Sequence, residues 1–279
     1  MNRRNYLELV TAGSITAAGA TLTPAASAQT AGKPPIVLVH GSWHWGGCFG
    51  KVSNLLAERG YAVAAPDLTS HGYSDAPYDS FSTMEAYAAP VEKILKESKE
   101  KVTLVGHSMG GVTLTYLAEK YPHKVRKLIY LTAFMVPNGK RALDYILLNT
   151  KLPAAAELFQ VVSQVNDGKG LKLDLTKPEL LKAAFYGDCS DHDVQIAVHN
   201  VLETGCTVAD VAVLRITAER FLRIPRVYIE CTQDKAIPIE TQRLMVKHVP
   251  GAKVVSIDTS HSSFFSQPEK LAKLILENA

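Results

Sequence analysis

The chain has little of several features that would define a class of protein by themselves. Its 279 residues include only four cysteines and two tryptophans, and 30 Lys and Arg nearly balance 27 Asp and Glu. Without a basic stripe or a strong excess of one charge, the sequence gives no reason to expect nucleic acid or an anionic membrane as a partner. The cysteines show neither C-x-x-C spacing nor a Cys/His zinc pattern, so no metal site is expected from them.

No stretch is long and apolar enough to predict a membrane span. The N-terminus instead resembles a targeting segment, because Arg3 and Arg4 precede a mildly apolar segment and the small-residue pattern A-S-A at 26–28. Paired arginines are typical of the twin-arginine export route, and the small residues predict cleavage after position 28. We therefore expect a signal peptide at residues 1–28 and an exported, periplasmic or secreted, domain at residues 29–279.

Export would place the cysteines in an oxidising compartment, where a disulfide is feasible. The pair to test is Cys189 with Cys206, which leaves Cys48 and Cys231 as free thiols. A domain of this length does not need a disulfide for its stability, so the sequence leaves this pairing open.

The most informative segment is G-H-S-M-G at 106–110. It follows the apolar run 102–105, which is typical of a buried strand, and a helix-like stretch follows it. Strand, G-x-S-x-G and helix are the order of a nucleophile elbow, in which Ser108 stands on a strained turn. The flanking glycines fit this interpretation, because a Cβ at either place would crowd the strand or helix that closes on the turn.

A serine nucleophile needs a base, and the base needs a third group that orients it. Asp234 follows the β-rich run 226–232, and His261 follows a second such run at 253–258. Both residues therefore come after the carboxyl ends of strands, the edge at which open α/β sheets bind ligands. Their order along the chain predicts a triad of Ser108 as nucleophile, Asp234 as acid and His261 as base.

Other residues compete for these roles. Asp258 is a rival acid, but it lies only three residues before His261 and after the later strand. The other histidines are interpreted as structural or pocket-lining residues at the same sheet edge (His40, His44, His71 and His107) or as surface and lid residues (His123, His192, His199 and His248).

The oxyanion that forms on attack needs two preorganised donors. One is the backbone N–H of Met109, directly after the nucleophile. We assign the second to the N–H of Ser42, in the Gly-rich loop after the apolar run 36–39, where Gly41 lets the backbone approach the site. This loop matches neither G-x-G-x-x-G nor a Walker A motif, which argues against phosphate binding.

The remaining segments predict an α/β fold. Further strands are expected at 61–65 and 127–131, and the capping box S-T-M-E at 82–85 should open a helix that Pro90 kinks. A second capping box, S-Q-P-E at 266–269, should open the final helix. Alternating strands and helices predict a mainly parallel sheet with helices on both faces.

The pattern changes between about residues 134 and 225, where no run looks like a buried strand. Helical segments are expected at 142–148, 178–186 and 194–202. An insertion at this place would form a helical lid over Ser108 that excludes water and shapes the pocket.

A cluster of acids in this insertion suggests a metal site. It consists of Asp188, Asp191, His192 and Asp193. These residues also surround Ser190, a natural N-cap, and acids are favourable at the start of a helix. We therefore prefer helix capping to metal binding.

Several segments carry a family resemblance: VLVHGSWHWGG, LVGHSMGG with EKYP and LTAFM, FYGDCS, and RVYIECTQDKAIP, spread over most of residues 36–265. Together they resemble the plant methylesterase and hydroxynitrile lyase group of α/β-hydrolases and its bacterial esterase relatives. GHSMG is shared by many hydrolases, whereas the last segment is far more specific. The resemblance implies an α/β-hydrolase fold, the same triad and oxyanion donors, and a small, largely apolar acyl pocket under a helical lid.

The branches of this group differ at two positions. In the pattern of the lyases, Thr follows the V-H of the first loop and Lys follows the catalytic histidine, whereas this chain has Gly41 and Ser262 there. The groups that would handle a cyanohydrin are missing, which favours an esterase over a hydroxynitrile lyase. Together with Trp43 and His107, these two residues are our candidates for the pocket.

We therefore predict a serine carboxylesterase that hydrolyses small carboxylic esters through an acyl-enzyme, without a metal or organic cofactor. A lactonase, an amide or C–C bond hydrolase on the same triad, and a ligand-binding member of the fold that retains the triad remain alternatives. The expected partner is a small-molecule ester, and a homodimer is left open. The natural ester depends on lid residues whose packing the sequence does not reveal.

Overall fold

A parallel sheet of six strands organises residues 33–279, the part of the chain that this computed structural model describes. The spatial order is β2-β1-β3-β4-β8-β9, and every neighbouring pair is parallel. The bounds are Ile36–Val39 (β1), Val63–Ala64 (β2), Val102–His107 (β3), Val125–Leu131 (β4), Arg226–Cys231 (β8) and Ala252–Ile257 (β9). The predicted α/β fold class is confirmed, whereas the predicted signal peptide at 1–28 lies outside the described residues.

The strand order changes direction at β1. The chain places β2 on one side of this strand and then crosses to place β3 on the other side. In open α/β sheets such a switch point leaves a crevice beyond the carboxyl ends of the two strands, where ligands bind. The loop after β1 and the turn after β3, which carry Gly41 and Ser108, therefore meet there.

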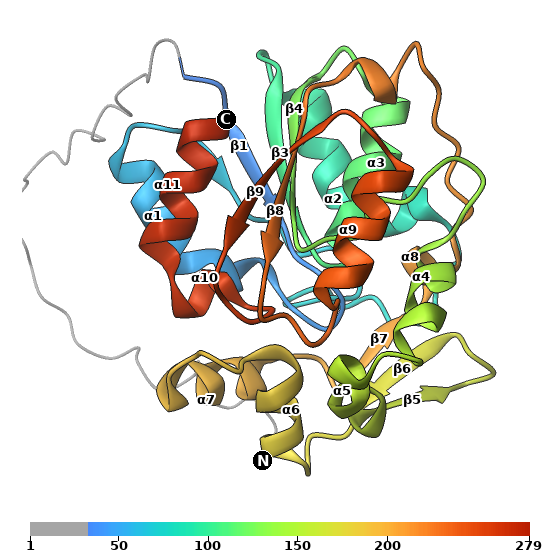
Figure 1. Ribbon diagram of the computed structural model, residues 1–279. Helices are drawn as coiled ribbons and strands as arrows, with labels where there is room; N and C mark the ends of the chain where they lie inside the picture. The colour runs from blue at the N-terminus through green and yellow to red at the C-terminus, as the bar shows by residue number, and fades with distance from the viewer. Residues whose placement is uncertain (1–32) are drawn as a thin grey trace, which may run out of the picture. The chain divides into compact units, whose positions relative to one another are not determined.

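Helices cover both faces of the sheet (Figure 1). One face carries α1 (Gly50–Glu58) and α11 (Pro268–Asn278), and the other carries α2 (Met84–Glu97), α3 (Gly110–Lys120) and α9 (Ile239–His248). Strand side chains alternate between the faces, so that Ile36 and Leu38 belong to one hydrophobic cluster and Val37 and Val39 to the other. Burial on both sides explains why these strands read as continuous apolar runs.

Several predicted element ends are wrong by a few residues. The N-cap of α2 is Thr83 rather than Ser82, because Thr83 has the extended conformation and its Oγ1 accepts the N–H of Ala86 at 3.2 Å. The same helix continues through Pro90 to Glu97. The strand expected at 61–65 shortens to Val63–Ala64, since this edge strand pairs only with β1.

The second predicted capping box, at 266–269, does not form. Ser266 ends a short helix, α10 (Ser263–Ser266), and its N–H bonds to the carbonyl of Ser262. Helix α11 starts at Pro268 with Gln267 as its N-cap and no side-chain cap bond. Proline replaces the capping box as the start signal, because its fixed φ suits the first helical position.

The insertion between residues 134 and 225 lies beyond the carboxyl ends of the sheet strands (Figure 1). Its helices are α4 (Ala142–Asn149), α5 (Ala156–Val161), α6 (Pro178–Phe185), α7 (Asp191–Asn200) and α8 (Val208–Val211), with short 3₁₀ turns at Pro153–Ala155 and Phe221–Arg223. The helices predicted at 142–148 and 178–186 are confirmed as α4 and α6. The third, predicted at 194–202, starts earlier at Asp191 because Ser190 caps it.

The expectation of a purely helical insertion is wrong. It contains a three-stranded antiparallel sheet of β5 (Val162–Val165), β6 (Gly170–Leu173) and β7 (Thr204–Cys206). These strands are short and partly exposed, so they lack the continuous apolar run of a buried strand. The segment N-D-G at 166–168 has three successive positive φ angles, and it was the available hairpin signal.

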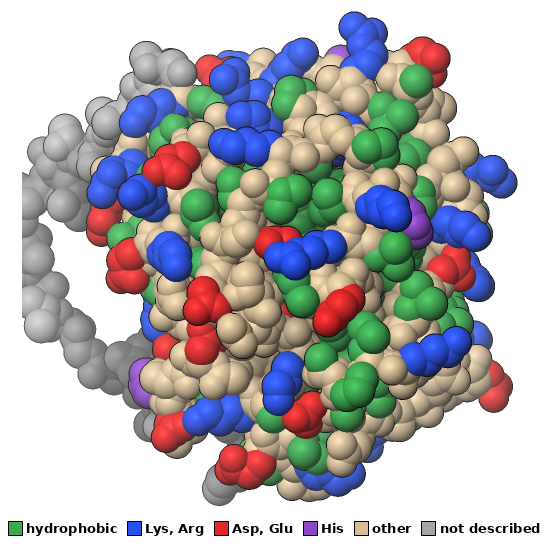
Figure 2. Space-filling model, viewed as in Figure 1, with side chains coloured by type: hydrophobic (Ala, Val, Ile, Leu, Met, Phe, Trp, Pro, Cys, Tyr) green, Lys and Arg blue, Asp and Glu red, His purple; other side chains and the backbone are tan. Residues whose placement is uncertain are grey.

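Charged side chains of both signs are interspersed over the face shown in Figure 2. This mixture agrees with the near balance of basic and acidic residues in the sequence. Along residues 33–279 no helix combines the length and the hydropathy needed to cross a bilayer.

Candidate active site

Ser108 occupies a sharp turn between β3 and α3. Its φ of 54° lies in the left-handed region, which costs strain for a residue with a side chain. A Cβ at Gly106 would lie 2.7 Å from the Leu114 side chain, and one at Gly110 would lie 2.5 Å from the carbonyl oxygen of Val39. The glycines are therefore needed at both places, because helix and strands close tightly on the turn.

The structure brings Asp234 and His261 together. His261 Nδ1 lies 2.7 Å from Asp234 Oδ2, and both side chains are buried. Asp234 also accepts the hydroxyl of Thr132 on the same oxygen and the N–H groups of Ala236 and Ile237, at 2.7 and 2.8 Å, on the other. This network fixes the carboxylate, so that it orients the imidazole with Nδ1 as donor and leaves Nε2 free to act as a base.

Ser108 Oγ and His261 share no hydrogen bond among the contacts of residues 33–279. In unliganded enzymes this bond is often long and shortens only when substrate is bound. The rival acid Asp258 is exposed and accepts instead from Thr232 and from Gln233, the latter at 2.9 Å. Asp258 therefore has no contact with the base.

The loop after β1 lies directly against the nucleophile. A Cβ built on Gly41 would fall 2.6 Å from Cβ and 3.1 Å from Oγ of Ser108, so only glycine fits. The N–H groups of Ser42 and Met109 donate to no acceptor in the described part of the chain, and both residues line the same cavity as Ser108. Two backbone donors without an acceptor therefore belong to residues at the same cavity as the Ser108 hydroxyl.

Two neutral histidines hold this loop. Burial lowers the pKa of His40 well below its ordinary value, and burial lowers that of His44 to about 4. Since His40 Nε2 accepts the N–H of Leu68 at 3.0 Å, its Nδ1 carries the proton and donates to the Gly41 carbonyl at 2.8 Å. In the planar trans peptide the N–H of Ser42 must point the opposite way, away from His40.

The insertion holds the next residues of the loop. Tyr186 donates its hydroxyl to His44 Nε2 at 3.1 Å, and His44 Nδ1 in turn donates to the Ser42 carbonyl at 3.0 Å. Trp43 has a strained φ of 61°, and its indole N–H donates to the carbonyl of Leu171 on β6 at 2.8 Å. The carbonyl of Trp43 accepts the N–H of Leu202 at 2.8 Å. The loop after β1, which we name the oxyanion loop for the role we propose below, is therefore held jointly by the core and the insertion.

A small cavity of about 70 Å³ opens beside Ser108. Its walls are mainly apolar side chains from the insertion and from the loops after the strands: Trp43, Phe134, Ile146, Leu158, Phe159, Val162, Leu171, Phe185, Ala236 and Ile237. Of the predicted pocket residues, Trp43 lines this cavity and Gly41 supports Ser108 behind it. His107 and Ser262 are fully buried and are not among its lining residues.

His107 has a different place from the one predicted. Its ring centroid lies 4.4 Å from that of His261, and its Nε2 lies 3.0 Å from the His261 carbonyl. Burial holds the pKa of His107 well below its ordinary value, so it is a neutral packing partner of the base. The hydroxyl of Ser262 is buried without a hydrogen-bond partner in residues 33–279.

The acid cluster of the insertion serves packing and capping. Ser190 Oγ accepts the N–H of Asp193 at 3.2 Å, and Asp193 pairs with Lys51 at 2.7 Å. Asp188 accepts from the backbone N–H of Ser260 at 3.1 Å and thereby fixes the loop before His261. Within residues 33–279 no group of three or more His, Cys, Asp or Glu is arranged to hold a metal.

The four cysteines are free, so the proposed pair does not form. Cys48, Cys189, Cys206 and Cys231 are all buried, and burial raises the pKa of each thiol. A protonated, buried thiol is a poor nucleophile. None of them competes with Ser108.

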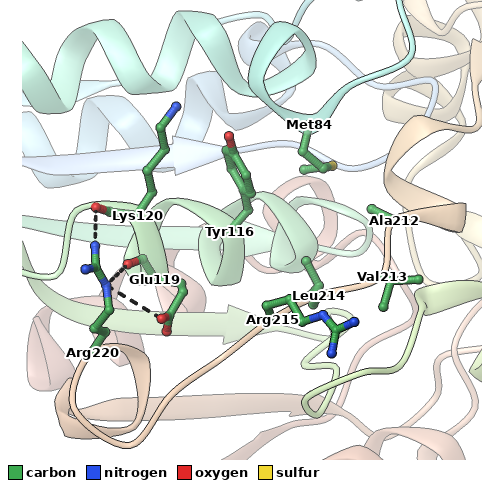
Figure 3. Close-up of a pocket in the computed structure, with 9 residues that line it drawn as sticks. All are labelled: Met84, Tyr116, Glu119, Lys120, Ala212, Val213, Leu214, Arg215 and Arg220. Atoms are coloured by element: carbon green, nitrogen blue, oxygen red, sulfur yellow. Dashed lines mark hydrogen bonds and ion pairs between the residues drawn. The ribbon is translucent and has the colours of Figure 1, made fainter.

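A larger hollow of about 470 Å³ lies elsewhere, between α3 and the segment 212–220 (Figure 3). Two arginines, Arg215 and Arg220, line it. The guanidinium group of Arg220 donates to the carbonyls of Glu119 and Lys120, the latter at 2.8 Å, and contacts the Glu119 carboxylate. These contacts fasten the returning chain to α3. No residue of the predicted triad lines this hollow, so its size does not make it the active site.

Sequence reasoning missed the roles of four residues of the site region: Tyr186, Asp188, Asn149 and Asp210. Each lies in the insertion, where the sequence has no periodic pattern that relates it to the sheet edge. The segment FYGDCS at 185–190, which carried part of the family resemblance, contains two of them. It was the one available signal.

The fold and this site together define the class of protein, an α/β-hydrolase. A model of the alpha/beta hydrolase family matches residues 36–274, and the chain belongs to that family. A pyrethroid hydrolase of Sphingobium wenxiniae is 37% identical over 245 residues, which cover 88% of this chain and 87% of the relative. Methylesterase 1 of Arabidopsis thaliana is 32% identical over 255 residues, which cover 88% and 96%.

Solved structures agree with these relatives. The crystal structure of a pyrethroid hydrolase from Sphingobium faniae matches with a TM-score of 0.79 at 34% identity and covers 88% of this chain and 96% of that chain. Polyneuridine aldehyde esterase matches with a TM-score of 0.76 at 27% identity, covering 88% and 99%. The expected resemblance to methylesterases and bacterial esterase relatives is therefore confirmed.

Proposed function

We propose that the protein is a serine carboxylesterase that hydrolyses small carboxylic esters through an acyl-enzyme. One observation carries this proposal: Ser108 and the free N–H groups of Ser42 and Met109 lie at a single apolar cavity, and the fixed pair of Asp234 and His261 packs behind its wall residue Phe185, whose ring centroid is 5.7 Å from that of His261. The relatives support the reaction type, since their names describe ester hydrolysis.

The geometry suggests a role for each group. Ser108 Oγ attacks the ester carbonyl while His261 Nε2 takes its proton, and the imidazolium that forms is stabilised by Asp234. The N–H groups of Ser42 and Met109 stabilise the oxyanion. His261 then gives its proton to the leaving alcohol. Water activated by the same histidine cleaves the acyl-enzyme, which regenerates Ser108.

The packing also argues for ester hydrolysis over cyanohydrin cleavage. A threonine at position 41 would place its Cβ 2.6 Å from the Cβ of Ser108, and residue 262 is fully buried outside the cavity. The two side chains by which the lyases differ therefore have no place in this site as it is built.

A panel of 4-nitrophenyl and alkyl esters, a lactone, an anilide and mandelonitrile tests the reaction class. We expect turnover of short aryl esters and no release of cyanide above background. Faster cleavage of mandelonitrile than of every ester would contradict the proposal. Binding of esters without turnover would show a ligand-binding member of the fold.

We further propose export by the twin-arginine route, with cleavage after residue 28. The pair Arg3 and Arg4 and the small residues at 26–28 support this. Replacing both arginines with lysine should leave uncleaved protein in the cytoplasm, whereas the wild type recovered from the periplasm should start at Gln29 by mass spectrometry. An intact Met1 in the periplasm would contradict cleavage. The homodimer stays a prediction, which light scattering of the purified protein tests.

A further inference from the structure

The apolar cavity contains one ionisable side chain among its described lining residues, Asp210 on α8. The residue is 3% exposed, and its Oδ2 has no hydrogen-bond partner in residues 33–279. The side-chain amide of the same wall differs from Asp210 in its hydrogen bonding. Asn149 donates to the carbonyl of Ala236 at 3.4 Å and accepts the hydroxyl of Thr241, so it is already paired within the protein. Asp210 is therefore the ionisable group of this wall, and its Oδ2 has no partner within residues 33–279.

Among residues 33–279 no cation offsets the burial of the Asp210 carboxyl. Tyr87 on α2 and Cys206 on β7 interact electrostatically with Asp210, and burial raises the pKa of both, so both are neutral. Helix α4 also packs on α8. The acid of α4, Asp144, forms an ion pair with Arg141 at 2.6 Å. Burial is therefore the main influence on the pKa of the Asp210 carboxyl.

The consequence is an acid that keeps its proton. Burial raises the pKa of Asp210 from an ordinary 3.8 to about 7, and its own backbone N–H offsets this only in part. Below neutral pH the group is mainly a carboxylic acid with an O–H donor. Unpaired buried donors destabilise a protein, so such a group in a ligand cavity points to a partner that arrives with the ligand.

We infer that Asp210 is the specificity-determining residue of this pocket and that its protonated carboxyl donates a hydrogen bond to an uncharged acceptor oxygen of the substrate. This rests on the proposed esterase function. The substrate class is a neutral ester with a second oxygen, such as an ether or ketone, outside the scissile group. A purely aliphatic chain leaves the O–H unpaired, and a site built for a hydrogen bond discriminates against an analogue that lacks it. Anionic esters are disfavoured, because they meet an acid in an apolar wall.

The test compares esters of equal length. 4-Nitrophenyl hexanoate is measured beside 4-nitrophenyl 3-ethoxypropanoate and 4-methoxybutanoate, in which oxygen replaces one methylene. The readout is the ratio of kcat/KM for the better oxygen-containing ester to that for hexanoate within each protein, which cancels effects common to all esters. At pH 6 we expect this ratio to be about tenfold higher in the wild type than in Asp210→Leu.

Two further proteins separate hydrogen bonding from structure. Asp210→Asn keeps an N–H donor that does not titrate, so its ratio should be independent of pH, whereas the wild-type ratio should fall between pH 6 and pH 8 as the carboxyl ionises. A pH effect that is common to all three esters cancels and leaves the ratio unchanged. The matched control is Asp167→Asn, which removes an exposed acid of the same insertion at a positive φ that asparagine accepts. It should behave as the wild type.

Equal ratios in the wild type and in Asp210→Leu would overturn the inference. A preference for 4-nitrophenyl 6-aminohexanoate over hexanoate that grows with pH would also overturn the inference, since it would mean that ionised Asp210 binds the ammonium group of the substrate. Calorimetric binding of the same esters to Ser108→Ala and to Ser108→Ala combined with Asp210→Leu gives the comparison without turnover. If the wild type hydrolyses no ester, the proposed function fails, and the binding ratio still decides the role of Asp210.

Discussion

The six-stranded sheet and the insertion at 134–225 differ in what holds their residues in place. In the core, Ser108 is fixed by backbone geometry, since β1, β3 and α3 close on a turn that only glycines permit at its flanks. In the insertion, Tyr186 and Leu171 act at a distance in sequence, through single hydrogen bonds to the oxyanion loop. The core therefore holds Ser108, Asp234 and His261, to which we assign the reaction, whereas the insertion holds the loop after β1 and forms much of the pocket wall.

The largest expected effect comes from the core. Ser108→Ala should lower kcat for 4-nitrophenyl acetate by about 10⁴-fold or more, and His261→Ala by nearly as much, because members of a triad act as a unit. A fluorophosphonate probe should label Ser108 alone. Ser80→Ala, on the surface, is the control and should retain activity. An active Ser108→Ala enzyme would contradict the proposed mechanism.

A second change breaks the contact between the oxyanion loop and the elbow. Gly41→Ala introduces a Cβ 2.6 Å from the Cβ of Ser108, so the loop or the serine must shift. We expect kcat to fall about 100-fold, since a displacement of about 1 Å is enough for such a loss. Gly50→Ala is the matched control, because a Cβ there meets nothing within 4 Å. Unchanged kcat in Gly41→Ala would show that the loop does not set the geometry of the site.

The link from the insertion to the loop should have a smaller effect. Tyr186→Phe removes the donor to His44 Nε2 and leaves that atom unpaired in a buried place. We expect kcat to fall about tenfold with little change in KM, because a loss of about 1.4 kcal/mol in oxyanion stabilisation corresponds to that factor. The opposite split, a raised KM with full kcat, would place Tyr186 in substrate binding instead.

The smallest expected effect is on stability, and we compare one buried acid of the insertion with one of the core. Asp210 keeps its proton in the folded state up to about pH 7, whereas the unfolded chain releases it near pH 3.8. The folded state therefore loses stability as pH rises through this window. Asp210→Asn should raise the thermal midpoint by about 3 °C at pH 8 and by much less at pH 4, followed by calorimetry. A gain of equal size at both values would exclude titration as its cause.

The acid of the core should show the opposite sign. Burial raises the pKa of Glu92, but hydrogen bonds from Lys96, Tyr121 and Lys120 more than offset this and lower it to about 2. Its stabilising contribution is present above its ordinary pKa of 4.5 and is lost as pH falls toward 2. Glu92→Gln should therefore lower the midpoint at pH 7, with a difference from the wild type that shrinks at acid pH.

The sequence by itself determined the core and the order of the reacting residues. Continuous apolar runs require strands buried on both faces, and G-H-S-M-G after such a run requires a turn that exposes Ser108. Asp234 and His261 follow later strands, and parallel strands end at one sheet edge. Local patterns suffice here because the sheet converts sequence order into spatial proximity.

Only the tertiary structure decided the pocket and the support of the oxyanion loop. The pairing of His44 with Tyr186 spans 142 residues, and no local pattern encodes it. The strands β5 to β7 are too short and too exposed to have a clear period, so packing against the core decides them. The unpaired acid Asp210 shows the same limit. In the sequence Asp210 looks like any other charged residue. Its burial in the apolar wall of the cavity is what makes it a candidate for substrate recognition.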